Sequence, residues 1–190
     1  MKSNLIKSIR VTLILIVILC VLYPLAISVA GKLSKGHGDG ETITLNGKVV
    51  GYANIGQSFT QPKYFWGRPS AVGYNAAGSG GSNKGPSNPD YLKDVNSRID
   101  TLLKYHPYLK RADIPAEMVT ASGSGLDPDI SPLAAKIQIE RVAKVRNLTT
   151  DAVAALVNLH TEKPLFGLFG PAKVNVLKLN VALDELKKQN

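Results

Sequence analysis

The stretch Val11–Ala30, VTLILIVILCVLYPLAISVA, decides the architecture of the chain. It runs for 20 residues without a charged side chain. At about 1.5 Å of rise per residue, a helix of this length spans roughly 30 Å, the thickness of the hydrocarbon core of a bilayer. Pro24 lies inside the stretch, and membrane helices tolerate proline better than soluble helices do. The sequence therefore predicts a transmembrane helix over residues 11–30.

Two other interpretations of this stretch compete with a membrane anchor. A buried core helix would show regularly spaced polar positions, whereas Thr12 and Ser28 are nearly the only polar side chains here. A cleaved signal peptide fits Ser28-Val29-Ala30, which has the small-x-small pattern of a cleavage site. The apolar region of a signal peptide is only about 7–15 residues long, so length favours the uncleaved anchor.

The charges that flank the stretch predict its orientation. Three basic residues and no acidic one precede it, whereas the flank after it mixes both signs. The positive-inside rule therefore places residues 1–10 in the cytoplasm and residues 31–190 outside it, in a protein of the cell (inner) membrane. The flanking charges are Lys2, Lys7 and Arg10 before the stretch, and Lys32, Lys35, Asp39 and Glu41 after it.

Composition narrows the class of protein further. The formal net charge is +9, but the cations are scattered singly, with only two adjacent pairs beyond the stretch, Lys110-Arg111 and Lys187-Lys188. A nucleic-acid partner would call for a clustered basic patch, so none is expected. The only cysteine, Cys20, lies in the predicted span, which excludes an intramolecular disulfide and a cysteine-based zinc site.

The rest of the chain predicts a glycine-rich linker over residues 31–41 and one α+β domain over residues 42–190. Thr42–Gly51 is typical of a hairpin around Asn46-Gly47, and the pattern allows strands over 52–59, 115–121 and 174–176. Cap residues and helical spacing predict four helices, and strands do not alternate with them as βαβ units. The helices begin at Asn88-Pro89, at Ser131-Pro132 running over Leu133–Arg146, at Thr149 or Thr150 ending near His160, and at Leu179 running to Gln189.

A long irregular region, Pro62–Pro89, separates the hairpin from the first of these helices. Loops beyond about 12–15 residues are usually functional or disordered. Its first part carries Tyr64, Phe65 and Trp66, and aromatic side chains favour burial. We therefore expect an ordered binding loop.

The glycine-rich stretch Thr120–Pro132, TASGSGLDPDISP, was tested as a phosphate-binding loop. It lacks the Gly-Lys-Ser/Thr of a P-loop, and Pro128 stands where the dinucleotide fingerprint needs its third glycine. Asp127 and Asp129 would repel phosphate. The two carboxylates are candidates for attracting a cation. The favoured interpretation is that they are structural and form an Asx-turn and a helix cap.

No catalytic or metal-binding pattern is visible. The chain has no G-x-S-x-G and no H-E-x-x-H, and its three histidines are isolated. His37 lies in the linker, while His106 and His160 are expected at helix ends, where the helix dipole favours His106. We expect neither a catalytic residue nor a bound metal.

Taken together, several motifs resemble the C subunit of the bacterial Kdp potassium-transporting ATPase over nearly the whole chain. They are GQSF (56–59), YFWGRPS (64–70), SGGSNKGPSNP (79–89), DIPAEMVTASGSGLDPDISPLAA (113–135), QIERVA (138–143), HTE (160–162) and VNVLKLNVALD (174–184). The resemblance implies a non-catalytic accessory subunit of a P-type potassium uptake pump, needed for assembly, stability and modulation of transport coupling. Its implied partners are a channel-like potassium-binding subunit, a P-type ATPase subunit, a small single-helix subunit and the bilayer.

The resemblance also implies a role as a catalytic chaperone that raises the ATP affinity of the ATPase subunit, and Gln57 of GQSF is the residue carried over as nucleotide-binding. No cofactor of its own is implied: ATP acts through the ATPase subunit, and the complex carries K+. The charge pattern places Gln57 outside the cytoplasm, so we expect the domain to sit over the outer mouth of the channel-like subunit instead. The alternatives are a free-standing membrane-anchored binding protein and a serine hydrolase that uses Ser122 or Ser124.

Overall fold

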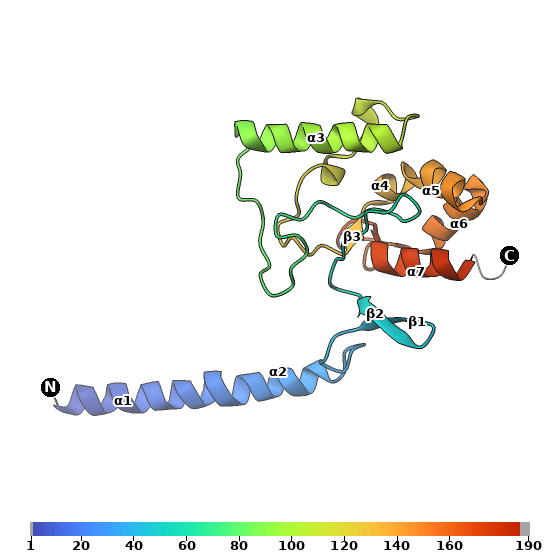
Figure 1. Ribbon diagram of the computed structural model, residues 1–190. Helices are drawn as coiled ribbons and strands as arrows, with labels where there is room; N and C mark the ends of the chain where they lie inside the picture. The colour runs from blue at the N-terminus through green and yellow to red at the C-terminus, as the bar shows by residue number, and fades with distance from the viewer. Residues whose placement is uncertain (1, 187–190) are drawn as a thin grey trace. The chain divides into compact units, whose positions relative to one another are not determined.

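The computed structural model describes residues 2–186, and the chain divides into two compact units between Thr42 and Ile43. The first unit contains the apolar stretch and the second contains the α+β domain (Figure 1).

The first unit is dominated by one helix over Lys2–Gly31, 30 residues long, with no buried residue in its most apolar window. It consists of α1 (Lys2–Ile16), a π-helical turn η1 (Val17–Leu22) and α2 (Tyr23–Gly31). Pro24 explains the wider turn, because its ring would clash with the carbonyl four residues earlier and it has no N–H to donate. The N–H of Tyr23 accordingly donates to the carbonyl of Ile18, five residues back. The predicted helix over residues 11–30 is confirmed, and it is consistent with a single-pass membrane anchor.

The second unit begins with the predicted hairpin. Strands β1 (Thr42–Leu45) and β2 (Lys48–Tyr52) pair around Asn46 and Gly47, whose φ angles of 53° and 75° suit a type I′ turn. The strand expected over Tyr52–Phe59 is wrong beyond its first residue. There the chain turns away and bonds a distant loop, with the Gly56 N–H donating to the carbonyl of Leu126 at 2.8 Å.

A second, three-stranded antiparallel sheet lies within the domain. It contains β3 (Asp129–Ile130), β4 (Thr161–Glu162) and β5 (Lys173–Asn175), in the order β3-β5-β4. Ile130 and Thr161 both lie opposite Val174 in the register. The expected strand at 174–176 is therefore present one residue earlier, at the centre of this sheet.

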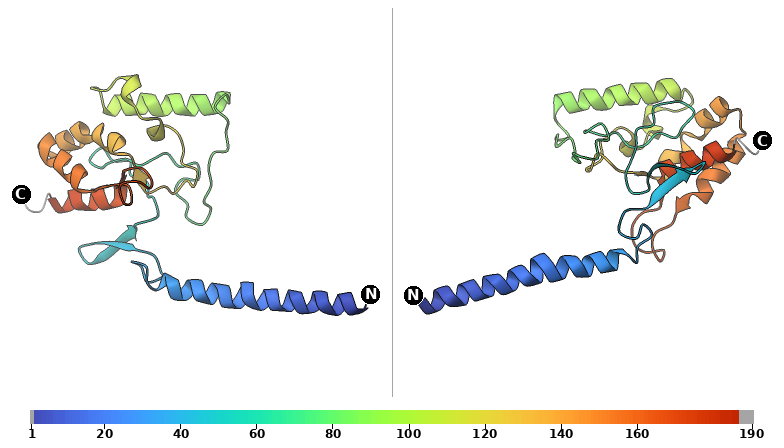
Figure 2. Two further views of the ribbon diagram at one scale, coloured as in Figure 1. Left: turned by 180° about the vertical axis from the view of Figure 1, so that it is seen from behind. Right: turned by 60° about the horizontal axis from the view of Figure 1, so that its bottom comes forward.

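Five helices complete the domain: α3 (Pro89–Tyr105), α4 (Pro132–Lys136), α5 (Ile139–Arg146), α6 (Thr150–Leu159) and α7 (Val176–Leu186). In the views of Figures 1 and 2, α3 lies along one side of the domain, while α5, α6 and α7 gather on another. One apolar cluster draws on both groups, with Ile99 and Leu102 from α3, Val142 from α5, Val153 from α6 and Leu183 from α7. The α+β class is confirmed.

Three predicted helix caps are confirmed by their hydrogen bonds. The side chains of Asn88, Ser131 and Thr149 accept from the backbone N–H groups three residues onward, at 3.0, 3.1 and 3.2 Å. Each pairs one otherwise unsatisfied donor at its helix start. The final helix begins at Val176, earlier than expected, and its expected end at Gln189 lies outside the described residues.

The expectation of one helix over Leu133–Arg146 is wrong, because the helix breaks between α4 and α5. The hydroxyl of Tyr108 inserts into the hydrogen-bond ladder, donating to the carbonyl of Ile137 at 2.8 Å and accepting from the N–H of Arg141 at 3.2 Å. The side-chain amide of Gln138 donates to the carbonyl of Ala134 at 3.0 Å. A side chain inserted between i and i+4 is a known cause of helix breaks.

The strand expected over Pro115–Ala121 is also wrong. Residues Ala116–Met118 form a 3₁₀ turn, η3, and a similar turn, η2, covers Arg111–Asp113. Met118 and Val119 are consecutive and both buried. A strand would point one of them away from the core, whereas a tight turn buries both.

Candidate functional site

The aromatic segment 64–66 of the long loop is held in place by two side chains of the QIERVA motif. Gln138 brackets Trp66, accepting from its N–H at 2.8 Å and donating to its carbonyl at 3.1 Å. Loop backbone has no ladder partners of its own, so buried N–H and C=O groups need side chains such as this one. Gln138 thereby makes the two backbone hydrogen bonds that a neighbouring strand would otherwise make with Trp66.

Arg141 is the centre of the same buried network and is only 4% exposed. Its guanidinium group packs over the ring of Trp66, 4.2 Å from the centroid, and donates to four acceptors. Burial lowers the pKa of Arg141 to about 10, so it stays charged at neutral pH. The acceptors are the carbonyls of Pro62 and Tyr64, Oε1 of Gln138 and Nε2 of His106.

His106 lies at the end of α3, as expected, but it is fully buried and neutral. Burial lowers its pKa to about 4, and the charge of Arg141 acts in the same direction. Its Nδ1 bonds the carbonyl of Leu102 at 2.8 Å, so this nitrogen carries the proton and Nε2 accepts from Nε of Arg141, also at 2.8 Å. The expected stabilisation of the imidazolium by the helix dipole is therefore outweighed by desolvation.

Helix α7 and the β5 strand before it hold further loop backbone. The side-chain amide of Asn180 accepts from the N–H of Phe65 at 2.8 Å and donates to its carbonyl at 3.0 Å. Asn175 donates to the carbonyl of Ala53 at 2.7 Å and accepts from the N–H of Lys178, as an N-cap does. The aromatic segment is thus fixed from two helices at once.

The loop over residues 120–128 is the meeting point of three other segments that carry the family motifs. The carbonyl of Leu126 accepts from Gly56 of GQSF, and the carbonyl of Ser124 accepts from Gly80 of SGGSNKGPSNP at 2.8 Å. The N–H of Ser122 donates to the carbonyl of Pro69 of YFWGRPS at 3.0 Å. Gly125 makes this close approach possible, with φ at +68° and a Cβ position that would lie 2.5 Å from Val72 Cγ2. The glycines here serve backbone packing.

Asp127, in this loop, and Asp129, at the start of β3, face cations of the chain itself. Asp127 pairs with Arg68 at 2.9 Å, and its other oxygen accepts from the N–H of Asp129 at 3.0 Å, which is an Asx-turn. Asp129 pairs with Lys173 at 2.7 Å and raises the pKa of that lysine. One oxygen of Asp129, Oδ1, is buried and has no hydrogen-bond partner within residues 2–186. Attraction of an external cation to either aspartate stays a prediction.

Gln57, the residue that the resemblance assigns to nucleotide binding, is half-buried against the hairpin. Its amide donates to the carbonyl of Val50 at 3.0 Å. A side chain on Gly51 would collide with this amide, so the two residues pack as a unit. In this arrangement Gln57 ties β2 to the segment that follows it, and nucleotide binding by Gln57 stays a prediction.

The serines of the hydrolase alternative have backbone partners. Ser122 is buried and its N–H is bonded to Pro69, while the hydroxyl of Ser124 accepts from the N–H of Leu126 at 3.1 Å. The ring nitrogens of His106 are both engaged, and Nδ1 of His160 bonds the carbonyl of Leu156 at 3.0 Å. Within the described part of the chain, no side-chain hydrogen bond joins a serine to a histidine, and no group of three or more metal-ligating side chains gathers.

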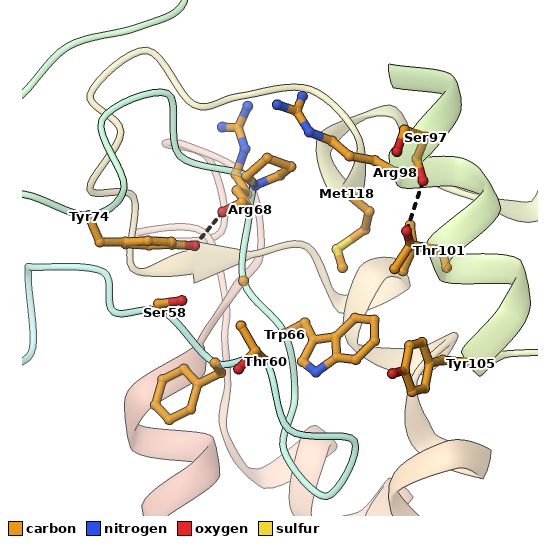
Figure 3. A pocket seen from close by; sticks show the side chains of 14 residues that line it. Ser58, Thr60, Trp66, Arg68, Tyr74, Ser97, Arg98, Thr101, Tyr105 and Met118 are labelled. Carbon is orange, nitrogen blue, oxygen red and sulfur yellow. Dashed lines mark hydrogen bonds between the residues drawn. The ribbon is translucent and has the colours of Figure 1, made fainter. Parts of the chain in front are cut away.

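A pocket of about 400 Å³ lies between the aromatic loop and α3 (Figure 3). Trp66 and Tyr105, in edge-to-face contact at 5.2 Å, share its wall with Arg68 and Arg98. Arg98 donates to the carbonyl of Val119 at 2.9 Å, and Arg68 is paired with Asp127. Mixed aromatic and cationic walls suit a polar or anionic group of a partner rather than a metal ion.

The fold and the site define a class of protein: a domain preceded by one apolar helix long enough to span a membrane, whose irregular loops are fixed by buried polar side chains and surround no recognisable catalytic set in residues 2–186. The family model described as "KdpC: K+-transporting ATPase, c chain" matches residues 5–185. The chain belongs to this family.

Curated relatives that match this chain over most or all of their length are named as the same subunit. The chain is 55% identical to the "Potassium-transporting ATPase KdpC subunit" of Bacteroides fragilis, over 98% of this chain and 100% of the relative. It is 59% identical to the protein of that name from Flavobacterium psychrophilum, over 97% and 100% of the two chains. Identity to the Caldanaerobacter subterraneus protein is 47%, over 96% and 95%. The resemblance to the family is thereby confirmed, and the chain is an accessory rather than a catalytic subunit of the ATPase.

The side chains that organise the site were not singled out from the sequence. Gln138, Arg141 and Asn180 lie inside motifs quoted only for resemblance, and their partners in the long loop are 72 to 115 residues away. A local signal does exist for Asn180, a polar residue with Val176, Leu177 and Leu183 at helical spacing on the buried face of α7. Buried polar residues of this kind need partners, and the long loop was the part of the chain with unpaired backbone.

Proposed function

We propose that the domain of residues 43–190 is an extracytoplasmic docking domain of the potassium pump. Its glycine-rich loops bind the channel-like subunit over the outer mouth, stabilise the assembled complex and shape the access of potassium. The observation that carries this proposal is the meeting of three motif-bearing segments at the loop 120–128.

The physical support is preorganisation. A loop that is ordered before binding loses little conformational entropy when a partner covers it. Gln138, Arg141 and Asn180 hold the aromatic segment, and the exposed residues Gly123 and Ser124 project from the fixed loop beside it. Such a surface suits protein recognition, since its backbone groups are already placed.

A substitution on this surface tests the docking role directly. Gly123 is exposed, and a Cβ added there meets nothing within 4 Å, so Gly123→Arg adds bulk outside the fold. We expect this variant to lose co-purification of the channel-like subunit and potassium uptake at micromolar potassium. Ala155→Arg, on the exposed face of α6, is the matched control and should retain both. Normal assembly of Gly123→Arg would contradict the docking surface.

The orientation needs its own test, because the docking role requires the domain to lie outside the cytoplasm. Alkaline phosphatase fused after Asn190 should be active in whole cells, and a green fluorescent protein at the same point should stay dark after export through the Sec pathway. The reverse pattern would place Gln57 beside cytoplasmic ATP and favour the chaperone role. The chaperone role is the second candidate function.

The chaperone role makes a separate prediction for Gln57. If the domain raises the ATP affinity of the pump, the Michaelis constant of the assembled complex for ATP should rise in Gln57→Ala. The docking role predicts an unchanged constant, since the Gln57 amide bonds the carbonyl of Val50. Gln57→Glu, which keeps the size of the side chain, controls for loss of packing.

A further inference from the structure

One segment of the domain carries no polar side chain at all. Residues 164–172, PLFGLFGPA, lie between Lys163 and Lys173. Four large apolar side chains follow one another at its tip and are 63–83% exposed. We call these residues, Leu165, Phe166, Leu168 and Phe169, the apolar tip. Isolated exposed leucines are ordinary on a protein surface, but a continuous apolar patch marks a contact with a partner or a membrane.

The backbone of the apolar tip satisfies its own hydrogen bonds. Leu165 donates to the carbonyl of Phe169 at 2.9 Å, and Phe169 donates back to Leu165 at 3.0 Å. Gly167 and Leu168 donate to the carbonyls of Pro164 and Leu165, at 2.8 and 3.1 Å. Four of the five N–H groups of residues 165–169 are therefore paired inside the loop. Backbone groups that enter lipid must be hydrogen-bonded within the protein, because lipid tails offer them no partner.

The chain keeps a bilayer within reach of this domain. The apolar helix ends at Gly31 and the compact unit begins at Ile43, so only residues 32–42 separate them. Even fully extended, this segment spans at most about 40 Å. Exposed Lys163 stands at the start of the apolar run, where a basic side chain meets lipid phosphates when a loop inserts shallowly, whereas Lys173 at the other end is paired with Asp129 and Glu162.

We propose that the apolar tip is a second membrane contact, inserted into the interfacial region of the bilayer that holds the N-terminal helix. The tip then fixes the domain at two points, the helix and the loop. This inference does not rest on the proposed docking to the channel-like subunit, and it holds for either orientation of the helix.

The test uses the full chain reconstituted in vesicles of phosphatidylcholine and phosphatidylglycerol. Cys20→Ser removes the only cysteine, and Phe166→Cys then accepts an environment-sensitive NBD label. Leu92→Cys, on an exposed apolar position of α3, is the matched control. Shallow doxyl-labelled lipid should quench the label at position 166 about twofold or more and leave that at position 92 nearly unchanged. Circular dichroism checks that both labelled chains are folded.

Two results would overturn the proposal. The first is a label at position 166 that stays unquenched by lipid and open to aqueous iodide. The second is a label that lipid does not quench and that becomes shielded from iodide only when the other pump subunits are added, which would assign the apolar tip to a protein partner. Quenching that disappears in the chain carrying Leu165→Ser and Leu168→Ser, with the label still at position 166, would support the insertion further.

Discussion

At the scale of the residue, the side chain of Arg141 supplies hydrogen-bond donors to loop carbonyls that have no strand beside them. Its guanidinium group donates to two loop carbonyls, to Gln138 and to His106, and it packs on Trp66. The bonds to His106 and Gln138 are buried and those to the carbonyls of Pro62 and Tyr64 are part-buried, so all four acceptors lose this donor together if the side chain is removed. An unsatisfied buried polar group costs about 1–3 kcal/mol.

We therefore predict that Arg141→Leu lowers the free energy of unfolding by about 3 kcal/mol or more. Arg141→Lys should recover only part of the loss, because one ammonium group cannot reach a planar set of acceptors. Urea unfolding of the full chain in micelles, followed by the fluorescence of the single tryptophan, Trp66, measures both. Arg111→Leu, at an exposed arginine, should stay within about 0.5 kcal/mol of the wild type. Equal effects at the two arginines would contradict the network.

His106 makes stability depend on pH. Its pKa is about 4 in the folded chain, against about 6.5 when unfolded, so the unfolded chain binds more protons between these values. Stability should be fully present above pH 6.5 and fall by about 3 kcal/mol as the pH drops to 4. His106→Gln should flatten this part of the profile relative to the wild type, which unfolding midpoints at pH 4.5 and 7.5 measure. An unchanged difference between the two pH values would show that carboxylates alone cause the loss.

At the scale of the element, the glycine-rich loop gives a prediction with an internal control. Gly125 has a φ of +68° and no room for a Cβ, whereas Gly123, two residues earlier, has open space. Gly125→Ala should destabilise the domain by about 2 kcal/mol or more, and Gly123→Ala by less than about 0.5 kcal/mol. Thermal unfolding of the two variants decides this. Equal melting temperatures would mean that the loop is not packed as described.

The same scale shows which elements a sequence can predict. The caps Asn88, Ser131 and Thr149 were found because each acts on an N–H three residues away. The break in the helix over 133–146 was missed, because the hydroxyl that causes it belongs to Tyr108, some thirty residues earlier. Likewise, the spacing of Pro115–Ala121 suits a strand, but burial of both Met118 and Val119 requires a turn. Interactions between residues a few positions apart, such as helix caps, can be predicted from the sequence. Contacts between distant segments follow only from the packing of the folded chain.

The candidate site follows the same rule. Asp127 was expected in an Asx-turn, and that local bond is present, but its pairing with Arg68 could not be predicted, since 59 residues separate them. The absence of a phosphate-loop pattern was readable directly. The hydrogen-bond network of Arg141 could not be predicted from the sequence, because a lone arginine in an amphipathic helix usually faces solvent.

At the scale of the whole molecule, the chain joins a membrane helix to a domain that is complete without it. Every residue of the apolar core cluster lies in the second unit, and no residue of the helix over Lys2–Gly31 is buried. The helix therefore contributes nothing to the apolar core, which is consistent with a role as a membrane anchor. This division suits an accessory subunit of an ATPase complex.

Hence we predict that the fragment 43–190 folds by itself. Its urea unfolding should be cooperative, with a free energy that agrees with that of the full chain within about 15%, because the same core is buried in both. Arg141→Leu should cost the fragment and the full chain the same amount, which ties the comparison to the described network. The fragment should also fail to restore potassium uptake in cells that lack the full chain, since it has no anchor. A fragment that unfolds without cooperativity would show that the membrane helix supports the fold. One that restores uptake would show that the anchor is dispensable for the function of the subunit.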